Sequence, residues 1–171
     1  EDHVAKHGAS IDNNPSPGNK RGGLTTILEK SLGAVAKGGQ TPLNGVFGYA
    51  EKVTGNGLVF MDTPGYDPVS ATGQVAGGAN IIVFTTGRGS CFGCRPTPSI
   101  KVATNSTMYH QMEDDMDVNC GVIASGEKTI AGMGREIFEL IIETASGRKT
   151  KSEDFGYGDN EFVPWHLGAT L

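Results

Sequence analysis

The sequence lacks the features that would point to a membrane, an export route or a nucleic-acid partner. No apolar run approaches the ~20 residues that a membrane-spanning helix needs. The opening residues, EDHVAKHGAS, have neither a basic start nor an apolar core, so they do not resemble a signal peptide. Acidic residues outnumber basic ones, 19 to 14, and a net charge of −5 argues against a nucleic-acid-binding surface. We expect neither a membrane nor a nucleic-acid partner.

Cysteines and hydrophobic residues are also few. Three cysteines, an odd number without an export signal, are typical of a protein in the reducing cytoplasm. A hydrophobic content of 37% is modest, yet 171 residues are enough to bury one core. His3, Val4 and His7 resemble the end of a helix that begins earlier. We therefore expect residues 1–171 to be a single domain cut from a longer protein.

Glycine, by contrast, is abundant, and the most informative stretch is broken by it. The 26 glycines are scattered without a repeat, which indicates many tight turns. Residues 81–84 form an apolar run typical of a strand buried on both faces, and residues 100–103 form a second short strand. Between them lies a polar loop, TTGRGS, at 85–90. Open α/β folds bind ligands at the carboxyl ends of parallel strands, so we expect this loop to be a ligand loop.

Hydrophobic periodicity predicts further elements around these strands. A third buried strand is expected at 58–61, followed by a helix of small residues over 69–78, which completes a β-loop-α-β unit. Apolar residues at helical spacing predict helices over 24–37 and 127–146. The remaining segments have weaker patterns. We expect a short helix or irregular segment at 42–53, a helical turn at 106–112, an edge strand at 116–119 and a loop at 8–23. The pattern favours an α/β fold with a mostly parallel sheet.

The TTGRGS loop carries groups suited to an anion. Thr85, Thr86 and Ser90 offer hydroxyls, and Arg88 offers a planar guanidinium that pairs with carboxylates or phosphates. The loop lacks the Gly-Lys-Ser/Thr of a P-loop and the spacing of a dinucleotide fingerprint. The alternative is an arginine that satisfies backbone carbonyls in a tight turn.

Other candidate residues lie at the ends of predicted elements. Asp62 follows the strand at 58–61 and would face the same cleft as Thr86 if the two strands were neighbours, although Asp-Thr-Pro-Gly is also an ordinary turn. The loop at 8–23 brings Asn19, Lys20 and Arg21 beside two glycines, or else serves as a solvated linker. Lys101, within a strand, is a candidate base or anion anchor unless alternation places it at an edge.

Cys91 and Cys94 form a CxxC pair, which in other settings indicates a redox or metal site. Pro96 and Pro98 oppose the helix that a redox motif requires, and a zinc site would need two further ligands. The pattern favours two small side chains in a tight loop.

Three long stretches resemble one family. NNPSPGNKRGGLTTILEKSLGAVAKGG at 13–39, FMDTPGYDPVSATGQVAGGANIIVFTTGRGS at 60–90 and GYGDNEFVPWHLG at 156–168 are similar to the carboxyl-terminal part of the altronate and galactarate dehydratases. The family also includes a sulfolactate sulfo-lyase subunit. The segment DTPGYDPVSATGQVAGG and the long tail resemble the altronate-type members more closely.

The resemblance implies a three-layer, Rossmann-like α/β/α domain of a hydro-lyase that converts a sugar acid, altronate in the favoured case, to a 2-keto-3-deoxy acid. It implies a divalent metal, iron or manganese, with ligands largely on the amino-terminal and middle domains of the same enzyme, and a possible homo-oligomer. It makes Lys20, Lys30 and Lys101 candidates for the base or anion anchor. The residues that fit substrate binding are Asn14, Asn19, Asp62, Thr85, Thr86, Arg88 and Ser90. The alternative is a non-catalytic scaffold domain whose aromatic tail serves assembly.

Overall fold

A computed structural model of the chain describes residues 2–11 and 15–168 and shows an α/β protein whose strands are all paired in parallel. β3 (Ile82–Thr86), β4 (Ser99–Ala103) and β5 (Val118–Asn119) form one sheet with β4 in the middle. β1 (Leu43–Phe47) and β2 (Leu58–Met61) form a separate pair. Because β3, β4 and β5 run parallel, their carboxyl ends lie at one edge of the sheet.

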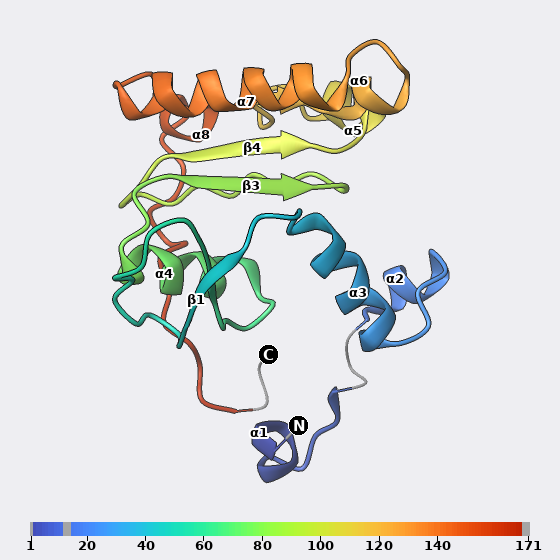
Figure 1. Ribbon diagram of the computed structural model, residues 1–171, viewed down its shortest axis with the longest axis vertical. Coiled ribbons are helices and arrows are strands. Elements are labelled where there is room, and N and C mark those ends of the chain that lie inside the picture. Colours follow the sequence, from blue (N-terminus) through green and yellow to red (C-terminus); the bar gives the residue numbers. More distant parts are fainter. Residues whose placement is uncertain (1, 12–14, 169–171) are drawn as a thin grey trace.

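Helices lie on both sides of these strands. In Figure 1, β3 and β4 run side by side between α4 (Asp67–Gly77) and α7 (Ile130–Ala145). This arrangement confirms the α/β class and is consistent with a three-layer α/β/α domain. The shorter helices are α1 (Asp2–Lys6), α2 (Pro17–Arg21), α5 (Ser106–Gln111), α6 (Gly121–Ala124) and α8 (Lys151–Asp154). α3 (Ile27–Lys37) lies beside α2, on the side toward which β3 and β4 point (Figure 1). Among the described residues, no helix is both long and apolar enough to span a membrane.

The core has two parts, and the long loop between β3 and β4 covers one of them. Phe92 from this loop stacks on Phe84 of β3, with ring centroids 5.3 Å apart. Ala71 of α4, Ile82 and Cys94 complete this cluster. The second cluster joins β4 to the α5 region through Ala103, Met108 and Met116. The loop that holds the CxxC pair is therefore packed against the sheet.

Most predicted elements are present with small shifts in their ends. The helix over 24–37 begins at Ile27, because the Thr26 hydroxyl accepts a hydrogen bond from the Glu29 amide at 3.2 Å and caps it. The strongly periodic segment at 127–146 is α7 and buries Met133, although Ile130 is exposed rather than part of the buried stripe. The edge strand and the helical turn after β4 are confirmed as β5 and α5.

Three predictions about the first half of the chain are wrong. Residues 42–53 contain β1, a strand, because pairing with β2 supplies hydrogen bonds that local propensity does not reveal. β2 is not buried on both faces, since Leu58 and Phe60 are exposed in a pair without a covering layer on that side. The loop at 8–23 includes the short helix α2, which begins at Pro17 after a Ser16 cap.

Candidate functional site

The TTGRGS loop is fixed by hydrogen bonds at the carboxyl edge of the sheet. The Thr86 hydroxyl accepts from the amides of Arg88 and Gly89, at 3.3 and 3.1 Å. The Asn105 side chain, which caps α5, donates to the Gly87 carbonyl at 2.8 Å. Gly89 has φ +88°, and a methyl group there would lie 2.0 Å from the Met112 sulfur, so only glycine fits. The predicted place of the loop, after a parallel strand, is confirmed. The prediction that this strand is buried on both faces is wrong, because Val83 of β3 is 40% exposed.

These contacts divide the loop side chains by role. The Thr86 hydroxyl shapes the turn, and the Ser90 hydroxyl accepts from the Phe92 amide at 3.0 Å. Thr85 and Arg88 are exposed. The exposed guanidinium thus stands on a turn held by Thr86, Ser90 and Asn105.

Arg88 is close to residues from two other segments. A methyl group at Gly18 would lie 3.6 Å from the Arg88 Nη1 atom and 3.9 Å from the Arg21 Nη2 atom. Next to Gly18, the Asn19 side-chain oxygen accepts from the Lys30 ammonium at 3.2 Å. Three cations from α2, α3 and the loop after β3 therefore gather around the start of α2. We call Arg21, Lys30 and Arg88 the cation cluster.

Asp67, at the start of α4, is an acidic residue whose pKa is affected by the charges of two of these cations, Arg88 and Lys30. Although the residue is exposed as a whole, desolvation of its carboxylate raises the pKa of Asp67, while the charges of Arg88 and Lys30 oppose that rise. Sequence reasoning missed Asp67 and left Arg21 out of the candidate set. The signals were a Pro-Gly turn before Asp67 and the basic pair Lys20-Arg21 in a glycine-rich segment.

The other predicted site residues are distributed differently. Lys20 lies in α2 beside Asn19. Asp62 follows β2, which pairs with β1 and not with β3, so the shared edge on which its pairing with Thr86 depended is not formed. Its amide donates to the Phe47 carbonyl at 2.9 Å. Asn14 is outside the described residues.

Lys101 is a buried cation in the central strand. The side chain has 0% exposure, and within residues 2–11 and 15–168 its Nζ atom has no hydrogen-bond partner. Burial lowers the pKa of Lys101, and the negative charges of Asp117 and Asp115 oppose this shift most strongly. The alternative of an edge position is therefore wrong, because β4 has a neighbour on both sides.

Asp117 forms hydrogen bonds with the backbone of β4 and α8 and not with the Lys101 ammonium. Its two carboxylate oxygens accept from the backbone amides of Lys101 and Lys151, at 2.7 and 2.9 Å. The carboxylate thus ties β4 to α8. Its hydrogen bonds do not depend on the Lys101 side chain.

The cysteines and acidic groups do not form a metal site in the described part of the chain. Cys91 is exposed and Cys94 is buried, and both are free thiols. Burial raises the pKa of Cys94, which disfavours a thiolate ligand. No group of three or more His, Cys, Asp or Glu side chains is placed to hold a metal ion among the residues described.

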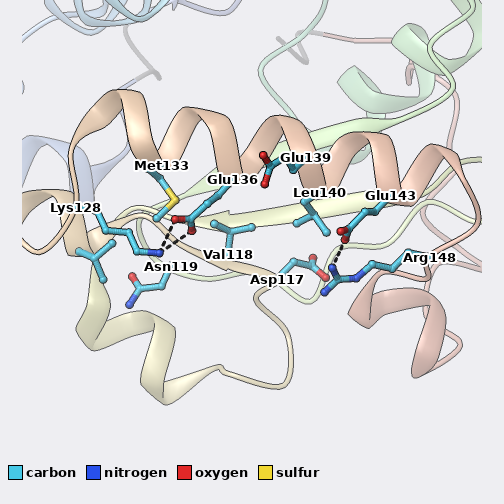
Figure 2. A pocket seen from close by; sticks show the side chains of 11 residues that line it. Asp117, Val118, Asn119, Lys128, Met133, Glu136, Glu139, Leu140, Glu143 and Arg148 are labelled. Atoms are coloured by element: carbon cyan, nitrogen blue, oxygen red, sulfur yellow. Dashed lines mark hydrogen bonds and ion pairs between the residues drawn. The ribbon is translucent and has the colours of Figure 1, made fainter.

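A cavity of about 390 Å³ lies between β5 and α7 (Figure 2). Its lining is rich in carboxylates, and two of them are paired: Glu136 with Lys128 at 2.7 Å and Glu143 with Arg148. Glu139 and Asp117 add further negative charge (Figure 2). This cavity repels a carboxylate ligand, so the cation cluster is the better anion site.

The sequence matches the family described as "D-galactarate/Altronate dehydratase, C-terminal" over residues 1–170. It is 44% identical over 144 residues to the galactarate dehydratase (L-threo-forming) of Escherichia coli (strain K12), a match that covers 84% of this chain and 28% of that protein. It is 37% identical over 169 residues to the altronate dehydratase of Bacillus subtilis (strain 168), covering 99% of this chain and 33% of that protein.

A third relative carries a different name. The (2R)-sulfolactate sulfo-lyase subunit beta of Chromohalobacter salexigens is 35% identical over 153 residues, which is 89% of this chain and 39% of that protein. In each comparison the chain spans well under half of the relative's length.

Proposed function

This chain belongs to the D-galactarate/altronate dehydratase C-terminal family, and from that premise we propose that it is the carboxyl-terminal part of a hydro-lyase that removes water from a sugar acid. The product would be a 2-keto-3-deoxy acid. The proposal extends to a cytoplasmic enzyme with a Rossmann-like domain here, further domains of the same polypeptide and an oligomeric assembly.

The observation that carries the proposal is the convergence of Arg88, Lys30 and Asn19. Arg88, after β3, is far from the other two in the sequence, yet it lies close to Gly18, the neighbour of Asn19, and the Asn19 side chain accepts a hydrogen bond from Lys30. The guanidinium suits two oxygens of a carboxylate, and the ammonium and amide suit neighbouring hydroxyls. Sugar acids carry both kinds of group.

The elimination requires a base, an acid and cations. A base takes the proton from the carbon next to the carboxylate, an acid protonates the leaving hydroxyl, and cations stabilise the enolate-like charge between the two events. We propose that Arg88 and Lys30 bind the carboxylate on which this charge develops. Lys20 lies next to Asn19 and remains the second candidate for an anchor or base.

Lys101 is the base candidate that the local chemistry favours. An amine can accept a proton only when it is uncharged, and burial lowers the pKa of Lys101 toward that state. Because its side chain is fully covered, Lys101 would reach a substrate only after the residues that cover it move. This role therefore requires an opened state of the domain.

The divalent metal that the resemblance implies has no fitting ligand set among the described residues. We propose that the ligands for iron or manganese belong to the remainder of the enzyme. The residues of this chain would then contribute substrate binding to a site completed elsewhere.

Altronate and galactarate are the two leading substrates. The altronate dehydratase of B. subtilis matches 99% of the chain, including the tail, whereas the galactarate dehydratase of E. coli is more similar, at 44%, over 84% of it. We propose altronate first because the tail resembles the altronate-type members. A sulfolactate substrate, as the third relative's name describes, is the remaining member of this set.

The function is tested in the full-length parent enzyme with altronate, galactarate and sulfolactate as substrates. We expect formation of a 2-keto-3-deoxy acid from altronate, monitored by its 2-keto group, and loss of activity on chelation. Activity with galactarate alone would correct the substrate and keep the reaction. No dehydration of either sugar acid, in an enzyme that is folded and supplied with iron or manganese, would contradict the proposal and favour the scaffold role.

A further inference from the structure

We propose that the apolar face of α3 is the surface on which the preceding part of the same polypeptide docks. This inference rests on the proposed function, because it treats the chain as the carboxyl-terminal part of a larger enzyme. It assigns α3 two tasks. One face binds the rest of the enzyme, and the other carries Lys30 at the cation cluster.

α3 is a well-formed helix whose apolar side is uncovered. Thr26 caps its first turn, and Glu29 accepts from the amide and hydroxyl of Thr25 at 2.8 and 2.7 Å. None of its residues is buried. Leu28, Leu32 and Val35 are 74%, 71% and 74% exposed.

These three residues form one stripe. They are spaced four and three residues apart, which places them above one another on a helix. An isolated helix of this length is marginal in water, so an apolar stripe of this kind is normally stabilised by packing against another element. Within the described chain nothing buries it.

Lys30 lies on the opposite side of the same helix. At 100° per residue, position 30 is roughly half a turn away from the centre of the 28-32-35 stripe. Its ammonium contacts Asn19, and its charge acts on Asp67. The apolar stripe therefore points away from the cation cluster.

The relatives' lengths identify the occupant. This chain spans 33% of the altronate dehydratase of B. subtilis, and the matched family is described as the carboxyl-terminal part. Most of such an enzyme therefore precedes the matched region. α3 stands among the first elements of the chain and apart from α7 (Figure 1), which is where we propose that the remainder of such an enzyme packs.

Docking here would also complete the site. The cation cluster can hold a carboxylate, but the described residues supply no cluster of three or more His, Cys, Asp or Glu side chains for a metal. A part of the enzyme that packs against the stripe would bring its own groups close to Lys30 and Arg88. α3 would then set the distance between the residues that bind the carboxylate and the groups that the docked part supplies.

The test measures protection of the stripe in the full-length parent enzyme. Leu32→Cys is treated with a maleimide, and labelling is followed by peptide mass spectrometry so that native Cys91 is counted separately. Lys149→Cys, at an exposed turn between α7 and α8, is the matched control. We expect labelling of Leu32→Cys to be at least roughly tenfold slower than labelling of Lys149→Cys, because docking leaves only local opening.

Equal rates at the two positions would overturn the proposal. Protection that disappears when the enzyme dissociates into monomers on dilution would assign the stripe to a second copy and overturn it as well. The dehydratase assay is a separate readout. If Leu32→Cys is protected but the enzyme dehydrates neither sugar acid, the docking proposal stands and the proposed function is rejected. A polar variant, Leu32→Ser, is expected to raise KM for the sugar acid if docking positions Lys30, and an unchanged KM would remove that coupling.

Discussion

At the scale of single residues, Lys101 is the most unusual group in the molecule. Its buried ammonium has no hydrogen-bond partner in the part of the chain that the structure describes, and such a group lowers stability because it loses its hydration and gains nothing equivalent. Asp117 is not left unpaired when the ammonium is removed, since two backbone amides already satisfy it. Structural need alone would not favour a lysine here, which supports a role in chemistry.

Replacement of Lys101 by methionine is expected to stabilise the chain. The change keeps the volume and removes the buried charge, so the free energy of unfolding should rise by about 1–3 kcal/mol. Chemical denaturation of wild type and Lys101→Met at pH 7 measures it, with Lys149→Met at an exposed site as the control. A large loss of stability would show that the ammonium has a strong partner and would contradict this account.

The stability gained by Lys101→Met should depend on pH, and the lowered pKa of Lys101 fixes the direction of this dependence. Burial lowers the pKa of Lys101 from its ordinary 10.5, so the unfolded chain binds this proton more tightly than the folded one. The penalty is complete below the folded pKa and disappears as the pH rises toward 10.5. The advantage of Lys101→Met should therefore shrink with rising alkaline pH, and an advantage that grows would contradict the assignment.

At the scale of elements, the sequence predicts those helices and strands whose formation depends mainly on residues within the segment itself. Helical periodicity predicts α7, and a run of small residues before Gly78 predicts α4. A short apolar run predicts β4. Each signal lies within one segment. β1 was missed because Leu43 and Val46 are exposed and the hydrogen bonds of the strand come from β2, which follows after a long connection. Burial of Lys101 likewise depends on β5, a distant strand.

Two glycines in helices give opposite predictions. A methyl group at Gly121, at the start of α6, would lie 2.1 Å from the Ser106 amide nitrogen, so Gly121→Ala must push α6 away from α5. We expect a loss of roughly 1–3 kcal/mol of stability, as for other overpacked sites. Gly134, within α7, has nothing within 4 Å of such a methyl, and Gly134→Ala should stabilise by about 0.5–1 kcal/mol.

Thermal denaturation of both glycine variants measures these effects. The opposite signs make the comparison informative, because a general sensitivity to any added methyl would lower both melting temperatures. A neutral Gly121→Ala would show that α5 and α6 are not in close contact, contrary to the fold described here.

At the scale of the whole molecule, the site depends on a convergence that no single segment reveals. The place of the TTGRGS loop, at the carboxyl end of a parallel strand, could be predicted from sequence, because strand composition and turn chemistry are local. The approach of Arg88 to Gly18 and the effect of Lys30 on Asp67 join segments dozens of residues apart. Asp62 illustrates the converse, since its predicted partner depended on a sheet order that the chain does not adopt.

The whole-molecule account also separates two electrostatic regions. The cation cluster lies with α2 and α3, and the carboxylate-lined cavity lies under α7 (Figure 2). We therefore expect an anionic ligand to be attracted to the cation cluster and repelled by the cavity. This contrast supplies a matched pair of arginines for the decisive test.

That test compares Arg88→Ala with Arg148→Ala in the full-length parent enzyme, assayed with altronate and galactarate. Both arginines are exposed, but Arg148 pairs with Glu143 beside the α7 cavity. Loss of a charge-assisted hydrogen bond of about 1.5–3 kcal/mol predicts a fall in kcat/KM of roughly 10- to 100-fold for Arg88→Ala, without a change in melting temperature. Arg148→Ala should keep its activity, whereas full activity in Arg88→Ala would remove the TTGRGS loop from the active site and leave this domain as a scaffold.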